Sequence, residues 1–476
     1  MFDVIVIGGG VIGGAILREL TKYRLKVCLL EKEDDVGMGQ SRANSGIVHA
    51  GFDAAEGSLK AKFNVAGNKM MYDYAAELGV KCTKNGSLVV AFSEEELQTL
   101  HELKARGERN GVPGLDVIDA EALKKLEPNI SDHALGALYA PTAGVVCPYS
   151  LTIASIGNAM DNGAELLCNF EVSQITKEGE LFCVVSRDSR QVTGTLVINC
   201  AGLGAGEVAK LAGDDSIRIG ARKGEYILID RESGDFVSHT LFFTPTKAGK
   251  GILVTRTADG NILLGPTAED TNSPFPDTSA AGLAAVTGKA LQMCPNVPLY
   301  NTITSFAGVR AYCDRHDFII EESRKVKGLI HCAGIESPGL TSAPAIAKYV
   351  AETLVGAHFS LEKNTSFNGK RQSDSFFKIL SVEEKNAMIK KDPAYGRIVC
   401  RCEQVTEGEI LHAIKSNPPA KNIDAVKRRT RSGMGRCQGG FCQPQVAQLL
   451  AQELNIPLEE VTKSGRGSNL LTGACK

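Results

Sequence analysis

The 476-residue sequence lacks any strong excess of charge, since 53 lysine and arginine residues face 55 aspartate and glutamate residues, for a net charge of −2. This balance gives no reason to expect nucleic acid or an anionic membrane surface as a partner. The sequence also lacks an apolar run of membrane-spanning length, an N-terminal signal peptide, an internal repeat and a low-complexity segment. We therefore expect a cytoplasmic protein, attached to a membrane at most peripherally through a partner.

The chain is too long for one compact core, so we expect two or three domains. Its fourteen cysteines fall into two groups. Ten are scattered among small or apolar neighbours, as Cys28, Cys200 and Cys332 are, which is typical of reduced, buried thiols. The other four form one C-terminal pattern.

The N-terminal segment has the pattern of a dinucleotide-binding unit. Val4–Ile7 is a β-branched run typical of a buried parallel strand. The glycine turn Gly8–Gly13 follows directly and opens an apolar-periodic helix. Lys26–Leu30 is a second strand that ends at Glu31, which is 18 residues after Gly13. A strand, glycine turn, helix and acid at these spacings predict dinucleotide binding, and a βαβ unit without a ligand is the alternative.

Each of these residues has a physical task in such a unit. Gly8 permits the tight turn, Gly10 lets the backbone approach a pyrophosphate, and Gly13 lets the helix pack on the strand. The helix N-terminus offers N–H groups and a positive dipole end to the phosphates. Glu31 is placed to accept a hydrogen bond from a ribose hydroxyl, which argues against a phosphorylated ribose.

Further along the chain, four segments organise the rest of the prediction. The loop 39–51 is small, polar and glycine-punctuated, so it can lie against a ligand. Residues 196–204 give a second strand-to-glycine turn, which we expect to return to the same sheet. Residues 218–309 change to short strands separated by turns, typical of an inserted antiparallel sheet. A strand and loop over 328–341 then lead to a helix that starts at Ser342–Pro344, with proline in its first turn.

Several of these stretches together resemble the glycine/D-amino-acid oxidase-like family of FAD enzymes. They are the N-terminal pattern with Glu31, the loop SRANSGIVHAG, the return GIESPGLTSAPAIA, the segment GKGILVTRTADGNILLGPTAED and the phrase FAGVRAY. The resemblance covers about residues 1–365 and points to the branch of glycerol-3-phosphate dehydrogenases and L-2-hydroxyglutarate oxidases. It implies FAD rather than NAD as the cofactor.

The resemblance also implies where the cofactor lies. The backbone of Val172 is expected to contact adenine, and Ser41 and Arg42 to lie along the cofactor. The helix N-terminus near Leu340–Ala343 is expected at the pyrimidine end of the flavin, where its dipole stabilises the negative charge of the reduced form. The expected cofactor-binding residues are, in chain order, Gly8, Gly10, Val11, Ile12, Gly13, Glu31, Lys32, Ser41, Arg42, Ser45, Gly46, Val172, Ala201, Gly202, Gly334, Gly339, Leu340 and Thr341.

Oxidation of an alcohol beside an anion requires a flavin to accept hydride, a base and a cation. His49 is the candidate base because it lies in the flavin-side loop and its ordinary pKa suits proton transfer near neutrality; the alternative is a histidine that only orients the loop. Arg310 is the candidate anion clamp, because a guanidinium holds carboxylate or phosphate with two hydrogen bonds. In the family that the chain resembles, the arginine at this place faces the substrate.

Three further residues are weaker candidates for substrate binding. Lys223 and Tyr226 are expected to line the same cavity from the inserted sheet. Arg256 departs from the family pattern, which has an uncharged residue there, often proline. It indicates either a more anionic substrate or a solvated surface arginine. His316, in a charged turn, and His331, in an apolar strand, are interpreted as structural.

The C-terminal cysteines Cys400, Cys402, Cys437 and Cys442 form two close pairs about 35 residues apart. In a cytosolic chain this pattern indicates a metal site rather than disulfides. Zinc and a [2Fe–2S] cluster are the two alternatives. The spacing C-x-C…C-x4-C resembles the bacterioferritin-associated ferredoxin-like domain, which implies the cluster.

The surroundings of the cysteines add three expectations. A capping box at Thr406–Glu409 starts a helix between the two pairs, and Cys442 opens a helix over Gln443–Leu454. A basic group around the second pair has two interpretations: it offsets the charge of an anionic cluster, or it is an ordinary solvated face. Its members are Lys427, Arg428, Arg429, Arg431 and Arg436.

The predicted fold is α/β: a Rossmann-like FAD region over 1–365, with an antiparallel substrate domain formed by insertions at about 80–145 and 218–310. A polar linker with a short helix follows at 366–397, and a small helical [2Fe–2S] module at 398–476. This combination resembles the large subunit of anaerobic glycerol-3-phosphate dehydrogenases.

The resemblance implies a dehydrogenase that oxidises sn-glycerol 3-phosphate to dihydroxyacetone phosphate by hydride transfer to flavin. Electrons would leave through the cluster to a partner subunit, quinone or other carrier, because an oxidase that reduces oxygen needs no such relay. The alternatives are a 2-hydroxy acid such as L-2-hydroxyglutarate as the substrate, an amine or amino-acid dehydrogenase, and an electron-transfer subunit without turnover of its own.

Overall fold

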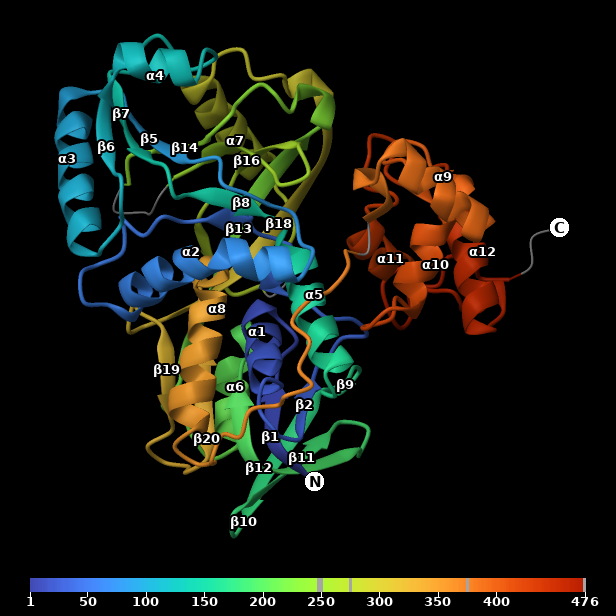
Figure 1. Ribbon diagram of the computed structural model, residues 1–476. Helices are drawn as coiled ribbons and strands as arrows, with labels where there is room; N and C mark the ends of the chain where they lie inside the picture. Colours follow the sequence, from blue (N-terminus) through green and yellow to red (C-terminus); the bar gives the residue numbers. More distant parts are fainter. Residues whose placement is uncertain (246–250, 274–275, 374–375, 474–476) are drawn as a thin grey trace.

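The computed structural model describes residues 1–245, 251–273, 276–373 and 376–473. Two of the expectations above fall partly outside these ranges: the first two residues of the GKGILV segment, 249–250, and one of the ten scattered cysteines, Cys475. Figure 1 shows two sheet-based parts stacked on one another and a helical C-terminal part beside them. No helix in the described ranges has the length and apolarity that a membrane crossing requires.

The first sheet has eight strands and lies in the lower part of Figure 1. Strands β9, β2, β1, β12 and β20 are parallel neighbours in that order, and β10, β11 and β19 extend the sheet with antiparallel pairs. The bounds are β1 Phe2–Ile7, β2 Val27–Leu30, β9 Glu165–Leu167, β10 Val172–Glu178, β11 Leu181–Ser186, β12 Gln191–Asn199, β19 Ile319–Glu322 and β20 Leu329–Ala333.

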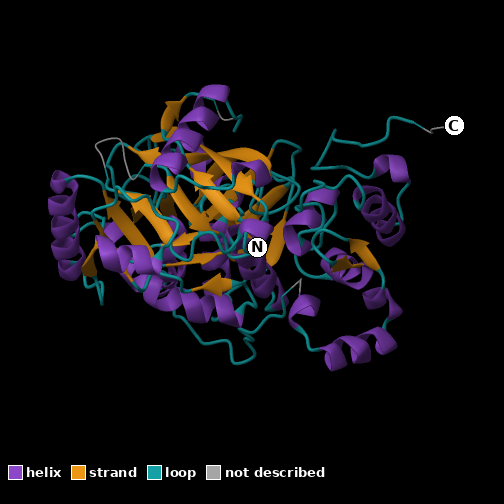
Figure 2. Ribbon diagram, turned by 90° about the horizontal axis from the view of Figure 1, so that it is seen from above, coloured by secondary structure: helices purple, strands orange, loops and turns teal. Residues whose placement is uncertain are grey.

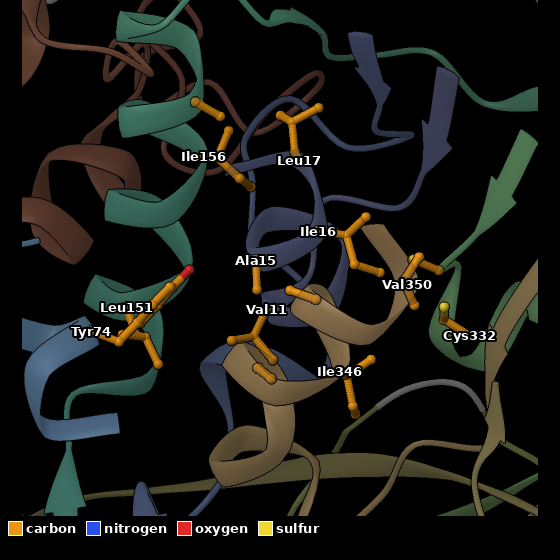
Figure 3. Packing of buried hydrophobic residues seen from close by; sticks show 14 of the residues in the cluster. Val11, Ala15, Ile16, Leu17, Tyr74, Leu151, Ile156, Cys332, Ile346 and Val350 are labelled. Carbon is orange, nitrogen blue, oxygen red and sulfur yellow. The ribbon is translucent and has the colours of Figure 1, made fainter. Parts of the chain in front are cut away.

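Both faces of this sheet are buried, which explains the continuous apolar run of β1. Val4 and Val6 pack with helices α1 (Val11–Leu20), α5 (Pro148–Asp161) and α8 (Gly339–Tyr349). Ile5 and Ile7 point the other way and pack with β10, β11 and helix α6 (Ala205–Leu211). Figure 3 shows α1 wedged between α5 and α8, with Ile16 and Leu17 among its buried side chains. The glycine turn therefore follows a strand that is packed on both faces.

The second sheet has nine strands, all paired antiparallel except β14 with β5. Both predicted insertions contribute to it, since β5, β6 and β7 come from the first and the other strands from the second. The bounds are β5 Ser87–Ala91, β6 Asp116–Asp119, β7 Gly136–Ala140, β13 Ile219–Ile229, β14 Thr240–Phe243, β15 Leu253–Arg256, β16 Ile262–Gly265, β17 Glu269–Thr271 and β18 Thr302–Cys313.

The remaining elements connect and cover the sheets. A small sheet of β3 (Ile47–Val48), β8 (Gly144–Val146) and β4 (Cys82–Thr83) lies next to helix α2 (Leu59–Glu77). Figure 2 shows helices around the margin of the strand-rich part. Those of the second sheet are α3 (Glu94–Arg109), α4 (Ala120–Leu126) and α7 (Ala280–Met293).

The C-terminal part is helical, as predicted. Helix α9 (Val382–Lys391) lies in the linker and begins with a capping box. Strands β21 (Ile398–Cys400) and β22 (Val405–Thr406) precede α10 (Glu407–Lys415), α11 (Ile423–Thr430) and α12 (Gln443–Leu454). The predicted capping box at Thr406 is present at the start of α10.

One helix start was predicted wrongly. Helix α8 begins at Gly339, not at Ser342, so Pro344 lies inside the helix rather than in its first turn. The reason is that the main chain already turns before Gly339: its N–H donates to the carbonyl of Glu336, and Ser342 N–H donates to Pro338. The helix N-terminus therefore lies nearer to the return loop than the position of the proline indicated.

Candidate cofactor and substrate sites

The glycine turn after β1 is closed by contacts that exclude any side chain. Gly8 has a φ of +111°, and a Cβ atom there would lie 2.4 Å from the carbonyl oxygen of Cys200. A Cβ on Gly13 would lie 2.0 Å from the carbonyl oxygen of Gly8. The turns after β1 and β12, including Ala201 and Gly202, consequently meet, as the second strand-to-glycine turn predicts.

The first turn of α1 donates a hydrogen bond to the polar loop and has no side-chain cap from its own N-cap residue. Its N-cap residue, Gly10, provides no side-chain hydrogen bond, and the N–H of Val11 donates to Ser41 Oγ at 2.9 Å. Ile12 and Gly13 continue the same turn. Ser41 and Arg42 belong to a short 3₁₀ turn, Gln40–Arg42, so the polar loop lies over the helix N-terminus. This is a place where a pyrophosphate could bind to N–H groups and the dipole end.

Glu31 is buried at the end of β2 and held in a fixed orientation. Its Oε2 accepts the N–H of Gly9 at 2.6 Å, and its Oε1 accepts the N–H of Glu33 at 2.9 Å. Burial raises the pKa of Glu31, and the two N–H groups oppose this effect. Each oxygen keeps a further lone pair for a ribose hydroxyl. Lys32 next to it is exposed, and Val172 begins β10 half-buried.

The polar loop joins the return loop and the second sheet. Gln40 donates from Nε2 to the carbonyl of Ile335 at 2.9 Å and accepts the N–H of Ala311 at 2.7 Å. The N–H of His49 donates to Thr341 Oγ1 at 2.9 Å, and Thr341 Oγ1 donates to the carbonyl of Ile47. The N-terminus of α8, with Gly339, Leu340 and Thr341, thus lies directly against the segment that carries Ser45, Gly46 and His49.

His49 is fixed from several sides. Its carbonyl accepts hydrogen bonds from Asn64 and Asn68, one turn apart on α2, and its ring lies 6.0 Å from that of Phe242 with an angle of 30° between the planes. Its Nε2 is 3.2 Å from Ser337 Oγ in the return loop. The ring therefore lies between Phe242 of the second sheet and Ser337 of the return loop.

Arg310 lies on the same face of the second sheet as Tyr226. In the pairing of β13 with β18, Arg310 is opposite Arg222, and Tyr226 is opposite Phe306. Arg310 donates from Nη2 to the carbonyl of Thr267 at 2.9 Å, while its Nε is buried without a hydrogen-bond partner in the described part of the chain. An unpaired buried N–H of a charged group is costly, so this Nε is a donor that a bound anion could use.

Tyr226 links Arg310 to the polar loop. Its ring stacks on Phe306 at 4.8 Å, and burial raises the pKa of its hydroxyl although Arg310 and Ser45 oppose this. The carbonyl of Ala43 would lie 2.1 Å from a Cβ on Gly308, so the loop touches the sheet closely. Ser45, Tyr226 and Arg310 therefore form one group beside the loop.

The structure does not bring Lys223 and Arg256 into this group. Lys223 is opposite Val309 in the pairing, on the other face of β13, where its Nζ is 2.9 Å from the buried Glu225; alternation along the strand explains this. Arg256 is 44% exposed and pairs with the exposed Asp235 at 3.1 Å, which agrees with the interpretation as a solvated arginine. His331 is buried against Asp214 at 3.1 Å, as a structural histidine.

The four C-terminal cysteines come together as two pairs. The sulfur atoms of Cys402 and Cys437 are 3.5 Å apart, and Cys400 accepts a hydrogen bond from Cys442. This bond, with those from backbone N–H groups, lowers the pKa of Cys400 despite its burial. Within the described ranges, no three His, Cys, Asp or Glu side chains converge as ligands for a single metal ion. Two pairs of thiols suit a two-iron cluster better than one zinc ion.

The interpretation of the basic group requires correction. Arg428 and Arg429 are buried rather than solvated, and they bind Asp35 of the N-terminal segment. Arg431 bonds to Asp259 at 2.7 Å and to Glu403 at 2.9 Å. Arg436 is exposed and pairs with Asp230 and Glu232, and Lys427 is half-buried. These arginines mainly dock the module, because their partners belong largely to the rest of the chain.

Sequence reasoning missed the partners of these arginines and the supports of His49. Asn64 and Asn68 had a usable signal, since two asparagines four residues apart share one face of a helix. Asp35 had none, because it follows Glu31 in a short acidic run that resembles a solvated loop.

Comparison with known proteins agrees with the observed geometry. Residues 3–353 match the family described as FAD dependent oxidoreductase (DAO). The chain belongs to the FAD-dependent oxidoreductase (DAO) family. Residues 398–452 match a BFD-like [2Fe-2S] binding domain.

Among relatives of this DAO-family enzyme, a glycerol 3-phosphate dehydrogenase of Caloramator mitchellensis is 46% identical over 477 residues, covering 100% of this chain and 99% of the relative. The L-α-glycerophosphate oxidase of Mycoplasma pneumoniae, solved with FAD bound, gives a TM-score of 0.74 at 32% identity, over 78% of this chain and 98% of the oxidase. The mitochondrial L-2-hydroxyglutarate dehydrogenase of Bos taurus is 30% identical over 74% of this chain and 88% of the relative.

The enzyme is therefore an oxidoreductase whose cofactors are FAD and a [2Fe–2S] cluster. The close contacts at Gly8 and Gly13 and the first turn of α1, which its N-cap Gly10 leaves without a side-chain cap, fit the pyrophosphate of FAD. The two thiol pairs fit the cluster. FAD supplies the acceptor for two electrons from the substrate, and the residues of the chain supply binding, orientation and proton transfer.

Proposed function

We propose that this DAO-family enzyme oxidises sn-glycerol 3-phosphate to dihydroxyacetone phosphate and delivers the electrons through its [2Fe–2S] cluster to a separate acceptor. The observation that carries the proposal concerns Arg310, on the strand face that borders the polar loop: its buried Nε has no hydrogen-bond partner among the described residues. A phosphate oxygen would satisfy this donor. The full-length similarity to a glycerol 3-phosphate dehydrogenase supports the choice of substrate.

In this proposal Arg310 binds the phosphate and Tyr226 borders the same pocket. His49 accepts the proton of the C2 hydroxyl at Nε2, the ring nitrogen that faces Ser337. The remaining residues around His49 keep its ring in place through its main chain. A His49→Ala variant that reduces its flavin at the full rate would remove His49 from this role.

The C-terminal module supports a dehydrogenase rather than an oxidase. The M. pneumoniae oxidase aligns over nearly its whole length but leaves about a fifth of this chain without a counterpart, whereas the Caloramator dehydrogenase matches the whole chain. We infer that Cys400, Cys402, Cys437 and Cys442 hold the cluster. We also infer that the acceptor is a partner subunit, a quinone or another carrier, so membrane attachment through a partner is part of this proposal.

The test is anaerobic addition of single substrates to the purified holoenzyme while the flavin absorbance is followed. Bleaching by sn-glycerol 3-phosphate is the expected result. Bleaching by L-2-hydroxyglutarate alone would transfer the assignment to the second candidate, which the similarity to the bovine enzyme favours. No bleaching by any alcohol, hydroxy acid or amine would instead indicate an electron-transfer subunit without its own substrate.

A further inference from the structure

The C-terminal module is anchored on the same short segment that binds the adenosine half of FAD in the proposed site. Asp35, four residues after Glu31, is 5% exposed. Its Oδ2 accepts from Arg428 at 2.6 Å and from Arg429 at 3.0 Å, and its Oδ1 accepts from Arg429 at 2.9 Å. The contact joins residues almost 400 positions apart.

Asp35 is also tied to the glycine turn. The N–H of Val36 donates to Asp35 Oδ1 at 2.9 Å, and the N–H of Gly37 donates to the carbonyl of Gly9 at 2.8 Å. Gly9 in turn donates to Glu31. Asp35 is thus connected to the turn and to Glu31 by way of two hydrogen bonds, from Gly37 to Gly9 and from Gly9 to Glu31.

The contact is sensitive to the loss of any one member because the charges are buried together. Burial alone would raise the pKa of Asp35, but the guanidinium groups of Arg429 and Arg428 outweigh it and hold the pKa below its usual range. Arg429 also donates hydrogen bonds to the carbonyls of Pro418 and Ala425 within the module. Removal of one member would leave the others as uncompensated buried charges, which is far more costly than removal of an exposed pair.

A second contact between the module and the N-terminal segment lies at the adenosine end of the proposed FAD site. Asn422, the N-cap residue of α11, donates to Asp34, and Gly465 approaches the same carboxylate so closely that a Cβ there would lie 2.9 Å from it. Beside them is a cavity of about 630 Å³ lined by both parts of the chain. Lys32, Asn169 and Glu171 line it from the first sheet, and Lys421, Thr462 and Arg466 from the module.

We propose that the [2Fe–2S] module forms one wall of the FAD site, so that docking of the module through Asp35, Arg428 and Arg429 and binding of FAD strengthen each other. Such coupling is reciprocal: the factor by which docking tightens FAD binding equals the factor by which FAD tightens docking. The module is in this sense a positioning element for the cofactor as well as the electron exit. The inference rests on the proposed course of FAD along residues 8–42 and is independent of the substrate.

The test combines two measurements on the full chain. FAD affinity is measured by titration of the apoprotein, and docking by the rate of limited trypsin cleavage within residues 366–397. For wild type, we expect slower cleavage with FAD than without. For Asp35→Asn and for the double variant Arg428→Gln/Arg429→Gln, we expect faster cleavage and an FAD Kd raised about 5- to 150-fold, the usual range of coupling between sites.

The matched control is Glu453→Gln, which removes the ion pair with Lys415 inside the module, away from the cleaved segment, and leaves the interface intact. It is expected to change neither quantity. Equal cleavage of wild type with and without FAD overturns the proposal, as does faster cleavage of the variants at unchanged Kd. A weaker Kd in Asp35→Asn but not in the arginine variant also overturns it, because the effect would then be local to the FAD segment. No substrate is used, so failure of the glycerol 3-phosphate proposal leaves these outcomes unaffected.

Discussion

Residues 8–13 and residues 428–431 both join separate parts of the chain, but they do so by opposite means. At Gly8 and Gly13, contact depends on the absence of side chains, since a Cβ atom would lie within 2.4 Å of a carbonyl oxygen. At Arg428, Arg429 and Arg431, contact depends on long charged side chains that reach carboxylates elsewhere. The first kind of contact fixes a turn for a ligand, and the second holds a module in place.

The difference explains how far each contact can be altered. A glycine in a close contact has no conservative substitute, whereas a charged interface can be weakened in steps. Even the smallest substitution in the cofactor turn is therefore expected to reduce stability and FAD binding, whereas the docked module is expected to respond in proportion to the charges removed. The predictions below test this contrast, from the largest expected effect to the smallest.

The largest effect is expected from loss of a cluster ligand. Cys437→Ser removes one thiolate of the pair with Cys402, and we expect loss of acid-labile sulfide and of electron delivery to a one-electron acceptor. Flavin reduction by substrate should persist. Cys183→Ser, on strand β11 of the first sheet, is the control and should keep sulfide and iron. If Cys437→Ser retained both, Cys437 would not be a ligand.

Arg310→Met tests the anion site. Loss of a charge-assisted hydrogen bond costs about 1.5–3 kcal/mol, so we expect kcat/KM to fall roughly 10- to 150-fold. The fall should come mainly from KM if Arg310 binds the phosphate equally in ground and transition states. Arg256→Met removes an exposed arginine of the same sheet and should change kcat/KM little. Equal effects of the two substitutions would contradict the assignment.

Gly13→Ala tests the close contact between Gly13 and the main chain of Gly8. The added Cβ would lie 2.0 Å from the Gly8 carbonyl oxygen, and overpacking of this kind typically costs about 1–3 kcal/mol of stability. Because the turn must move, we also expect weaker FAD binding, measured by titration of the apoprotein. Gly288→Ala, in helix α7 with open space around it, should instead gain up to about 1 kcal/mol. Thermal unfolding of the two variants distinguishes these results.

The same contrast decides what the sequence could reveal. Gly8, Gly10, Gly13 and Glu31 have a local requirement at a fixed spacing, so the turn and the α/β fold were predictable. The basic run around Arg429 has the composition of a solvated face, and its partner Asp35 lies almost 400 residues away in the sequence. The docking of the module could therefore not be predicted from the sequence. Lys223 lies away from Arg310 and Tyr226 for a related reason. The position of a residue in a motif does not determine which face of a long strand it occupies, whereas the pairing register of the strand does.

The first sheet and the contact that docks the module should lose stability at different pH values. Burial lowers the pKa of His331 in the first sheet although Asp214 opposes this, so the unfolded chain binds the proton more tightly. The resulting stability is present above the ordinary histidine value of about 6.5 and is lost as pH falls below it. The pKa of Asp35 is lowered by its arginines, so its contribution is present above the ordinary value of about 3.9 and is lost only below that.

We therefore expect the unfolding temperature of the holoenzyme to decline between pH 7 and 5 while the amides of helix α11 stay protected from hydrogen exchange. This protection, corrected for the intrinsic pH dependence of exchange, should fall only below about pH 4. His331→Gln should flatten the decline between pH 7 and 5, because glutamine can bond to Asp214 without titrating. Asp35→Asn should leave that decline unchanged and reduce the pH dependence of docking below pH 4, where the carboxylate partners of Arg431 and Arg436 still titrate. A decline between pH 7 and 5 that persists in His331→Gln would show that another group carries it, and the separation of the two regions by pH would then be lost.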